Sequence, residues 1–242
     1  MIRFDILTLF PNMFKGLIED SIIKRAIEKK LIEVNLIDFR EFSTNKHHTV
    51  DDYSYGGGAG MLISVEPVHL AMKTIPNLTN AKKLLMSPSG KTFNQEKAIE
   101  LSKDEHIVMI CGHYEGIDAR ILNFIDEEIS IGDYVLMGGE VPAMTILEAV
   151  SRLVPGVISE ESPVNESFSD SLLEHPQYTR PAIYEGFGVP DVLLSGHHAN
   201  IKKWQREKAL EKTLKVRPDL LKKANLFLDD YKYLWELKNE KN

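Results

Sequence analysis

An apolar run, Ile107-Val108-Met109-Ile110-Cys111, leads directly into a glycine-bearing loop, Gly112-His113-Tyr114-Glu115-Gly116. Two more predicted strands end in the same way, at Ser87-Pro88-Ser89-Gly90 and at Ile131-Gly132-Asp133-Tyr134-Val135-Leu136-Met137-Gly138-Gly139. The carboxyl ends of parallel strands are where ligands bind, and glycines let backbone groups approach a ligand closely. Each loop alone is equally consistent with a tight strand-to-helix turn. The three in series favour a ligand site.

Strand-like and helix-like segments alternate around these loops. Strand patterns cover 2–9, 32–39, 83–86, 107–111 and 129–131, and helical patterns fall near 65–75, 94–103, 117–125 and 141–153. This order predicts an α/β fold with a parallel sheet. A Pro-, Ser- and Glu-containing stretch then predicts an extended linker, with only helices beyond it. We therefore expect an α/β domain over 1–158, a mobile linker over 159–178 and a small all-helical domain over 179–242.

Charge is distributed unevenly along the chain. The 242 residues carry a net charge of −7, so bulk electrostatics do not attract nucleic acid. Residues 201–223 nevertheless contain nine Lys or Arg against three Asp or Glu, a local net of +6. The segment is either a solvated helical face or an RNA contact, and Lys202, Lys203 and Arg206 are its candidate phosphate ligands.

The sequence lacks the motifs of several functional classes. The run Gly56–Gly60 has neither the Gly-Lys-Ser/Thr ending of a phosphate loop nor the dinucleotide fingerprint. The adjacent pairs His47-His48 and His197-His198 come without a cysteine cluster, which argues against zinc, and no serine nucleophile elbow is present. The single cysteine, Cys111, ends an apolar run, so we predict that it is a buried, inert strand residue. With no secretory signal or membrane-length apolar run, we expect a cytoplasmic protein.

Two charged residues in or near the predicted linker are consistent with more than one role. Asp170 precedes Ser-Leu-Leu, which suits a helix N-cap, yet it is also an acid flanked by apolar residues that could fold over a ligand. Arg152 lies near the end of a predicted helix, where a cation interacts favourably with the helix dipole. Spacing alone favours the structural reading of both.

At this point an ordered series of motifs resembles the bacterial tRNA guanine-N1 methyltransferases. The series includes Ser130-Ile131-Gly132-Asp133-Tyr134-Val135-Leu136, Gly138-Gly139-Glu140, Ser151-Arg152, Asp170-Ser171-Leu172-Leu173-Glu174 and Tyr178-Thr179-Arg180-Pro181. It starts at Phe4-Asp5 and continues to Gly196-His197-His198 and Trp204, so nearly the whole chain is covered. Two positions depart from the usual pattern, Ser54 in place of proline and Gln205 in place of arginine.

The resemblance implies a SPOUT-type parallel sheet with a deep trefoil knot, whose three loops wrap S-adenosylmethionine. It also implies a homodimer with active sites at the subunit interface, a carboxyl-terminal domain that grips tRNA, and a magnesium requirement with unknown ligands. The cofactor-binding positions carried over are Ser87, Pro88, Gly90, Gly112, Tyr114, Ile131, Gly132, Asp133, Tyr134, Val135, Leu136, Gly138 and Gly139.

The resemblance also assigns roles in methyl transfer to the guanosine immediately 3′ of the anticodon. Guanine N1 holds a proton that must leave before its lone pair can attack, and Asp170 matches the family's base. Arg152 matches an arginine suited to stabilise charge on the base, and Glu115 matches an acid beside the cofactor. Two alternatives stay open: a SPOUT methyltransferase for another RNA nucleoside, and a non-catalytic RNA-binding module.

Overall fold

The computed structural model describes residues 1–159, 166–168 and 170–239, and it divides into two compact units, Met1–Glu160 and Glu161–Asn242. The expected linker over 159–178 falls partly outside the described residues. Its later part belongs to the second unit, where Leu172 is buried and the Leu173 N–H donates to Thr213 Oγ1 at 2.8 Å.

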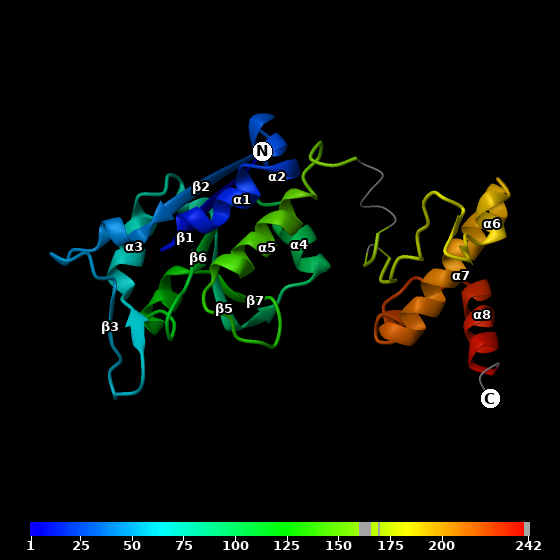
Figure 1. Cartoon of the computed structure of the whole chain (residues 1–242). Coiled ribbons are helices and arrows are strands. Elements are labelled where there is room, and N and C mark those ends of the chain that lie inside the picture. Colours follow the sequence, from blue (N-terminus) through cyan, green and yellow to red (C-terminus); the bar gives the residue numbers. More distant parts are fainter. Residues whose placement is uncertain (160–165, 169, 240–242) are drawn as a thin grey trace. The chain divides into compact units, whose positions relative to one another are not determined.

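A five-stranded parallel sheet forms the centre of the first unit, as predicted (Figure 1). Its order is β2 (Ile32–Asp38), β1 (Ile2–Thr8), β6 (His106–Cys111), β5 (Lys82–Thr92) and β7 (Glu127–Ser130). All six residues of β6 are buried, which explains its unbroken apolar run, because helices cover both faces of a parallel sheet. The sequence therefore predicted the sheet and its central strand correctly.

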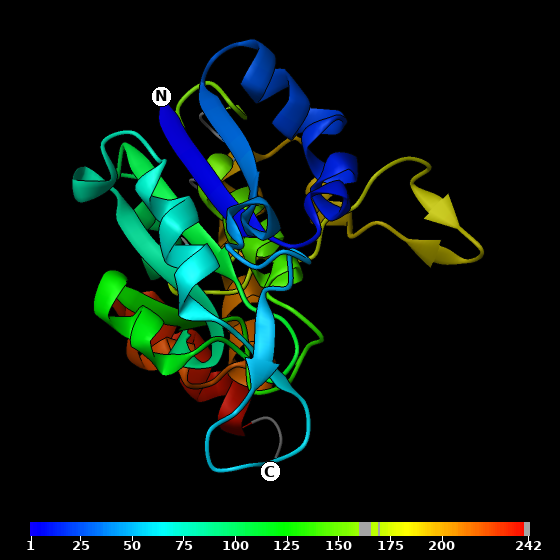
Figure 2. The same ribbon diagram turned by 90° about the vertical axis from the view of Figure 1, so that its left-hand side faces the viewer.

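Side chains alternate along each strand between two apolar cores. Phe4, Ile6 and Met109 face one core, and Leu7 and Val108 face the other. The first core packs against α1 (Lys15–Ile18), α2 (Ser21–Glu28), α4 (Gln95–Leu101) and α5 (Glu140–Ser151). The second packs against α3 (Val65–Lys73), and Figure 2 shows this helix in front of the sheet. The two layers fix the strands whose ends build the site.

Strand β5 continues through a segment that the sequence predicted to be a loop. Met86 pairs with Ile129, and Lys91 then pairs with Ile129 again, so residues 87–90 form a bulge inside the strand. The predicted helix over 117–125 is also wrong in type. It is a 3-10 helix, Ala119–Phe124. Asp118 is its N-cap, and the Asp118 side chain accepts from the Arg120 N–H.

The second unit is not all-helical, so that expectation was wrong. It contains α6 (Asp191–Leu194), α7 (His198–Val216) and α8 (Leu228–Asn239), but also a hairpin of β8 (Ile183–Tyr184) and β9 (Phe187–Gly188). The hairpin forms because Glu185 and Gly186 both adopt positive φ, as a two-residue turn of this kind requires. Helix α7 ends at Val216, inside the basic segment 201–223, because Pro218 disfavours helical backbone at the residue before it.

The shorter elements complete the described chain. Strands β3 (Asp51–Tyr53) and β4 (Met61–Ile63) form a small antiparallel hairpin around the glycine-rich run. Further 3-10 turns cover Pro11–Phe14, Phe39–Phe42, Leu78–Asn80 and Leu220–Lys222. Strand β4 contacts the loop after β6, since the Ile63 N–H donates to the Gly116 carbonyl at 2.9 Å.

A buried ionic cluster lies within the sheet near the start of β1. Asp5 is 1% exposed, accepts two hydrogen bonds from Arg3 at 2.8 and 2.9 Å, and contacts His106 Nε2 at 2.6 Å. Burial pushes the pKa of Asp5 upward, but the hydrogen bonds from Arg3 and His106 outweigh burial and hold this pKa below its usual range. The folded protein therefore favours the ionised Asp5 more than the unfolded chain does.

We expect Asp5→Asn to lower the free energy of unfolding by about 3 kcal/mol, because a buried ionic partner is removed. A depressed folded-state pKa stabilises the protein above the unfolded value, and this stabilisation is lost as pH falls. The gap between wild type and variant should therefore be constant near neutral pH and shrink below about pH 4. Urea unfolding at several pH values measures it. A gap that does not change with pH would contradict this assignment.

Candidate functional site

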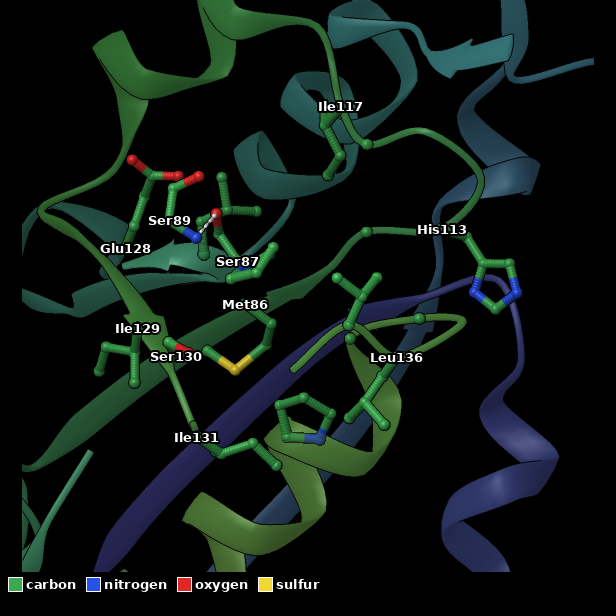
Figure 3. Close-up of a pocket in the computed structure, with 18 of the residues that line it drawn as sticks. Met86, Ser87, Ser89, His113, Ile117, Glu128, Ile129, Ser130, Ile131 and Leu136 are labelled. Atoms are coloured by element: carbon green, nitrogen blue, oxygen red, sulfur yellow. Dashed lines mark hydrogen bonds between the residues drawn. The ribbon is translucent and has the colours of Figure 1, made fainter. Parts of the chain in front are cut away.

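An open cleft of about 410 Å³ lies where the strands β5, β6 and β7 end. Its walls come from the β5 bulge, the loop after β6, the 3-10 segment at 119–122 and the long loop between β7 and α5. Figure 3 shows Ser87, Ser89 and Glu128 on one side and His113 and Leu136 toward the other. The loops that the sequence singled out therefore share one cleft, at the sheet edge predicted for it.

Eleven of the thirteen predicted cofactor residues line this cleft. They are Ser87, Pro88, Gly112, Tyr114, Ile131, Gly132, Tyr134, Val135, Leu136, Gly138 and Gly139. Glu115 lines it too. Gly90 and Asp133 are not among its lining residues. Gly90 instead packs against the backbone of β7, where a Cβ would overlap Glu128 and Ile129, so its requirement for glycine is structural.

Other lining residues were missed by the sequence analysis. They are Leu85, Met86, Ser89, His113, Gly116, Ile117, Ala119, Ile121, Leu122, Glu128, Ile129, Ser130, Met137 and Pro142. Ser89, His113 and Met137 stand inside the loops already singled out, so the loops themselves were the available signal. The 3-10 segment at 119–122 carried no sequence signal for a ligand site, because its sequence resembles that of an ordinary helix.

Backbone contacts hold the cleft loops together. The Gly139 N–H donates to the Gly112 carbonyl at 2.8 Å, and a Cβ at Gly139 would lie 2.7 Å from the Cys111 Cα. Real Cβ atoms do not come this close to a backbone atom, so only glycine allows the contact. At the other end of the loop, Ser130 Oγ donates to the Gly132 carbonyl at 2.9 Å. The loop between β7 and α5 is thus tied at both ends.

The glycine-rich run next to β4 has a structural explanation at its last position. Gly60 adopts a φ of +84°, and a Cβ there would overlap the side chain of Glu115. The Glu115 N–H also donates to the Met61 carbonyl at 3.1 Å. The small hairpin therefore supports the loop that presents Glu115 to the cleft.

Cys111 is fully buried at the end of β6. Burial and the nearby charge of Glu140 raise the pKa of its thiol well above the usual range. A neutral, inaccessible thiol is a poor nucleophile, in agreement with the sequence prediction.

The catalytic candidates lie in different units. Arg152 caps the end of α5, and its N–H donates to the Glu148 carbonyl at 3.1 Å. Asp170 belongs to the second unit, is 47% exposed, and pairs with Arg206 at 2.7 Å. No helix begins after Asp170 within 171–178, so the helix-cap reading of this residue is wrong.

Arg206, one of the three candidate phosphate ligands, is engaged inside the second unit. Besides Asp170 it donates to Asp230 at 2.9 Å and to the Asn225 carbonyl at 2.7 Å, and its guanidinium lies 5.6 Å from the Phe227 ring centre. Lys202 and Lys203 are exposed on α7. The three candidates therefore differ in how accessible they are to an RNA phosphate.

Two kinds of feature are absent from the residues that the structure describes. Within 1–159, 166–168 and 170–239, no three His, Cys, Asp or Glu side chains converge closely enough to hold a metal ion. In the same part of the chain, no helix has both the length and the apolar character needed to cross a membrane.

The sheet and its cleft define an α/β protein that can hold a ligand of small-molecule size on backbone-rich loops at its strand ends. Comparison with known proteins then gives the family. Residues 2–223 match the family described as tRNA (Guanine-1)-methyltransferase TrmD. This chain belongs to that family.

Relatives support this membership along almost the full length. A tRNA (guanine-N(1)-)-methyltransferase of Caldanaerobacter subterraneus subsp. tengcongensis is 55% identical, covering 96% of this chain and 97% of the relative. The protein of that name from Staphylococcus carnosus is 54% identical, with 98% of each chain covered. That from Dictyoglomus turgidum is 51% identical, covering 99% of this chain and 98% of the relative.

We expect Gly90→Ala to lower the free energy of unfolding by about 2 kcal/mol or more, because its Cβ would press on the backbone of β7, which cannot move aside. Gly16→Ala is the matched control. Gly16 has open space around it in α1, so alanine there should be neutral or slightly stabilising. Urea unfolding compares the two variants. Equal stabilities would show that β5 and β7 do not depend on this close approach.

Proposed function

We propose that this protein transfers a methyl group from S-adenosylmethionine to N1 of the guanosine immediately 3′ of a tRNA anticodon. The observation that carries the proposal is the cleft: the loops assigned to the methyl donor on family grounds are the loops that converge at the strand ends. Its volume is within the usual range for small-molecule sites. Because tRNA is the substrate, we also infer that the protein works in the cytoplasm.

The cleft suits a donor held largely through backbone groups. Gly112, Gly132 and Gly139 contribute no side chains to the cleft, so a ligand can approach the backbone of these loops closely. Met86, Ile129 and Leu136 add apolar surface on which an adenine ring can pack. When bound, S-adenosylmethionine supplies a methyl group on a sulfonium and leaves as the neutral thioether.

The residues of this chain then have to make guanine N1 nucleophilic. We assign Asp170 as the base that takes the N1 proton, so that the freed lone pair forms the new N–C bond as the C–S bond breaks. The Arg152 guanidinium stabilises the negative charge that builds toward O6. Glu115 lies on the cleft wall, where it can orient the base or the donor. Asp170 must exchange its contact with Arg206 for the guanine to do this.

The family also implies a trefoil knot, which we infer for the first unit. Its support is that the loop after β7 returns to pack Gly139 against Cys111 and Met86, close beside the β5 bulge. An experimental chain trace over 82–151 tests this inference, and an unthreaded trace would contradict it.

We further propose a homodimer with shared active sites. Val135 and Met137, on the loop that closes the cleft, are 84% and 91% exposed, and Val141 follows at the start of α5. Exposed apolar residues gathered on one loop are typical of an interface. A second copy covering them could also bring its Asp170 to this cleft. Sedimentation equilibrium measures the assembly directly, and a monomer at micromolar concentration would contradict it.

A magnesium requirement stays an expectation of the family. Mg²⁺ usually binds through one or two carboxylates together with substrate phosphates and water, so its ligands on this chain stay unassigned. No step above depends on it.

We expect Asp170→Asn to lower the turnover number at least about 100-fold while the affinity for S-adenosylmethionine stays unchanged. Asp219→Asn is the matched control, because Asp219 is also an exposed carboxylate paired with an arginine of the same unit. Labelled donor and a tRNA transcript, followed by mapping of the modified nucleoside, give the readout. Near-normal turnover in Asp170→Asn would remove its role as base.

The same assay separates the alternatives. Methylation mapped to N1 of the expected guanosine supports the proposal. A methyl group on another nucleoside would indicate a SPOUT enzyme with a different RNA target. Donor binding without turnover on any tRNA would indicate a non-catalytic RNA-binding module.

We expect tRNA affinity to fall steeply with salt despite the acidic whole chain, because the basic segment of 201–223 neutralises phosphates. The double variant Lys202→Glu/Lys203→Glu should weaken binding and flatten this dependence. Arg206→Gln should instead lower stability of the second unit, since Arg206 ties together its segments. Filter binding from low to high salt measures the slope. An unchanged slope in the lysine variant would place the RNA contact elsewhere.

A further inference from the structure

A buried carboxylate lies directly behind the cleft, outside the set of residues assigned above. Glu140 is the first residue of α5 and is 1% exposed. Its Oε1 accepts a hydrogen bond from Thr8 Oγ1 at 2.8 Å, and Thr8 Oγ1 in turn accepts from the Phe10 N–H at 2.9 Å. One oxygen of Glu140 thus fixes the end of strand β1.

The second oxygen faces the loop after β6. Glu140 Oε2 lies 3.4 Å from His113 Nδ1, and neither atom has a hydrogen-bond partner elsewhere among the described residues. A buried carboxylate without a compensating donor is costly. The contact is attractive whenever His113 Nδ1 carries a hydrogen, whether the ring is neutral or cationic. The two groups are therefore each other's natural partners.

The contact occurs where two cleft loops touch. His113 and Gly138 form an antiparallel bridge, and a Cβ at Gly138 would overlap both the His113 ring and Glu140 Oε2. The His113 ring also packs against Phe10, with 4.7 Å between ring centres. Figure 3 shows His113 at the edge of the cleft opposite Glu128. Glycine at 138 is what leaves space for the pair.

We propose that Glu140 is a positioning residue for the methyl-donor cleft. Through Thr8 it anchors the end of β1, and through His113 it fixes the loop after β6 against the loop before α5, so that the two loops keep the separation that the donor requires. The inference rests on the proposed function, because it takes S-adenosylmethionine as the ligand of this cleft.

The test measures donor affinity and stability separately, using S-adenosylmethionine in calorimetric titrations of the full chain. Glu140→Gln keeps the shape but loses the charge, and we expect its dissociation constant for the donor to rise about tenfold, with the KM for tRNA unchanged. His113→Asn, which alters a partly exposed residue, should give a similar rise. The double variant should be no weaker than either single variant, because both changes remove one interaction.

Asp5→Asn is the matched control, since it also removes a buried carboxylate beside a histidine in the same sheet, away from the cleft lining. It should lower stability yet leave the donor dissociation constant within about twofold of wild type. If Glu140→Gln fails to fold, His113→Asn still gives the readout.

Either of two results would overturn the proposal. The first is wild-type donor affinity in Glu140→Gln, or in a folded His113→Asn. The second is a double variant whose affinity for the donor falls by the product of the two single effects. Failure of the proposed function looks different. In that case wild-type protein itself would not bind S-adenosylmethionine.

Discussion

The cleft depends on the hydrogen bond from the Gly139 N–H to the Gly112 carbonyl, which joins the loop before α5 to the end of β6. It requires the loop before α5 to lie directly on the end of β6, with no side chain between them. Gly138 allows the same approach beside His113, and Gly90 allows β5 to reach β7 a second time. Glycines therefore do two things in this protein: they bring backbone against backbone, and they leave the cleft walls without side chains at their positions.

In the first unit, the buried ionic cluster that stabilises the fold lies apart from the groups at the cleft. Near the start of β1, Asp5, Arg3 and His106 form a buried cluster whose partners are all satisfied. At the carboxyl ends, Glu140 Oε2 and His113 Nδ1 are buried atoms at the cleft that lack a hydrogen-bond partner. Incomplete satisfaction at one end of a well-packed sheet is typical of a site whose geometry serves a ligand.

The strands could be predicted because burial on both faces leaves an unbroken apolar run, as in Ile107–Cys111. The cleft could be predicted in outline because glycine loops follow those strands. The bulge in β5, the Glu185-Gly186 hairpin and the Glu140–His113 contact could not, since each depends on which segments meet in space. The functional assignment came from motif resemblance, because spacing alone had left Asp170 and Arg152 with structural readings.

Amide hydrogen exchange with and without S-adenosylmethionine tests whether the converging glycine loops hold the methyl donor. Exchange reports on the backbone amides of the loops that line the cleft. With binding verified by calorimetry, we expect slower exchange at 112–116 and 131–139 and no change at the start of β1. Protection confined to the second unit, or absent from both loops while the donor is bound, would contradict it.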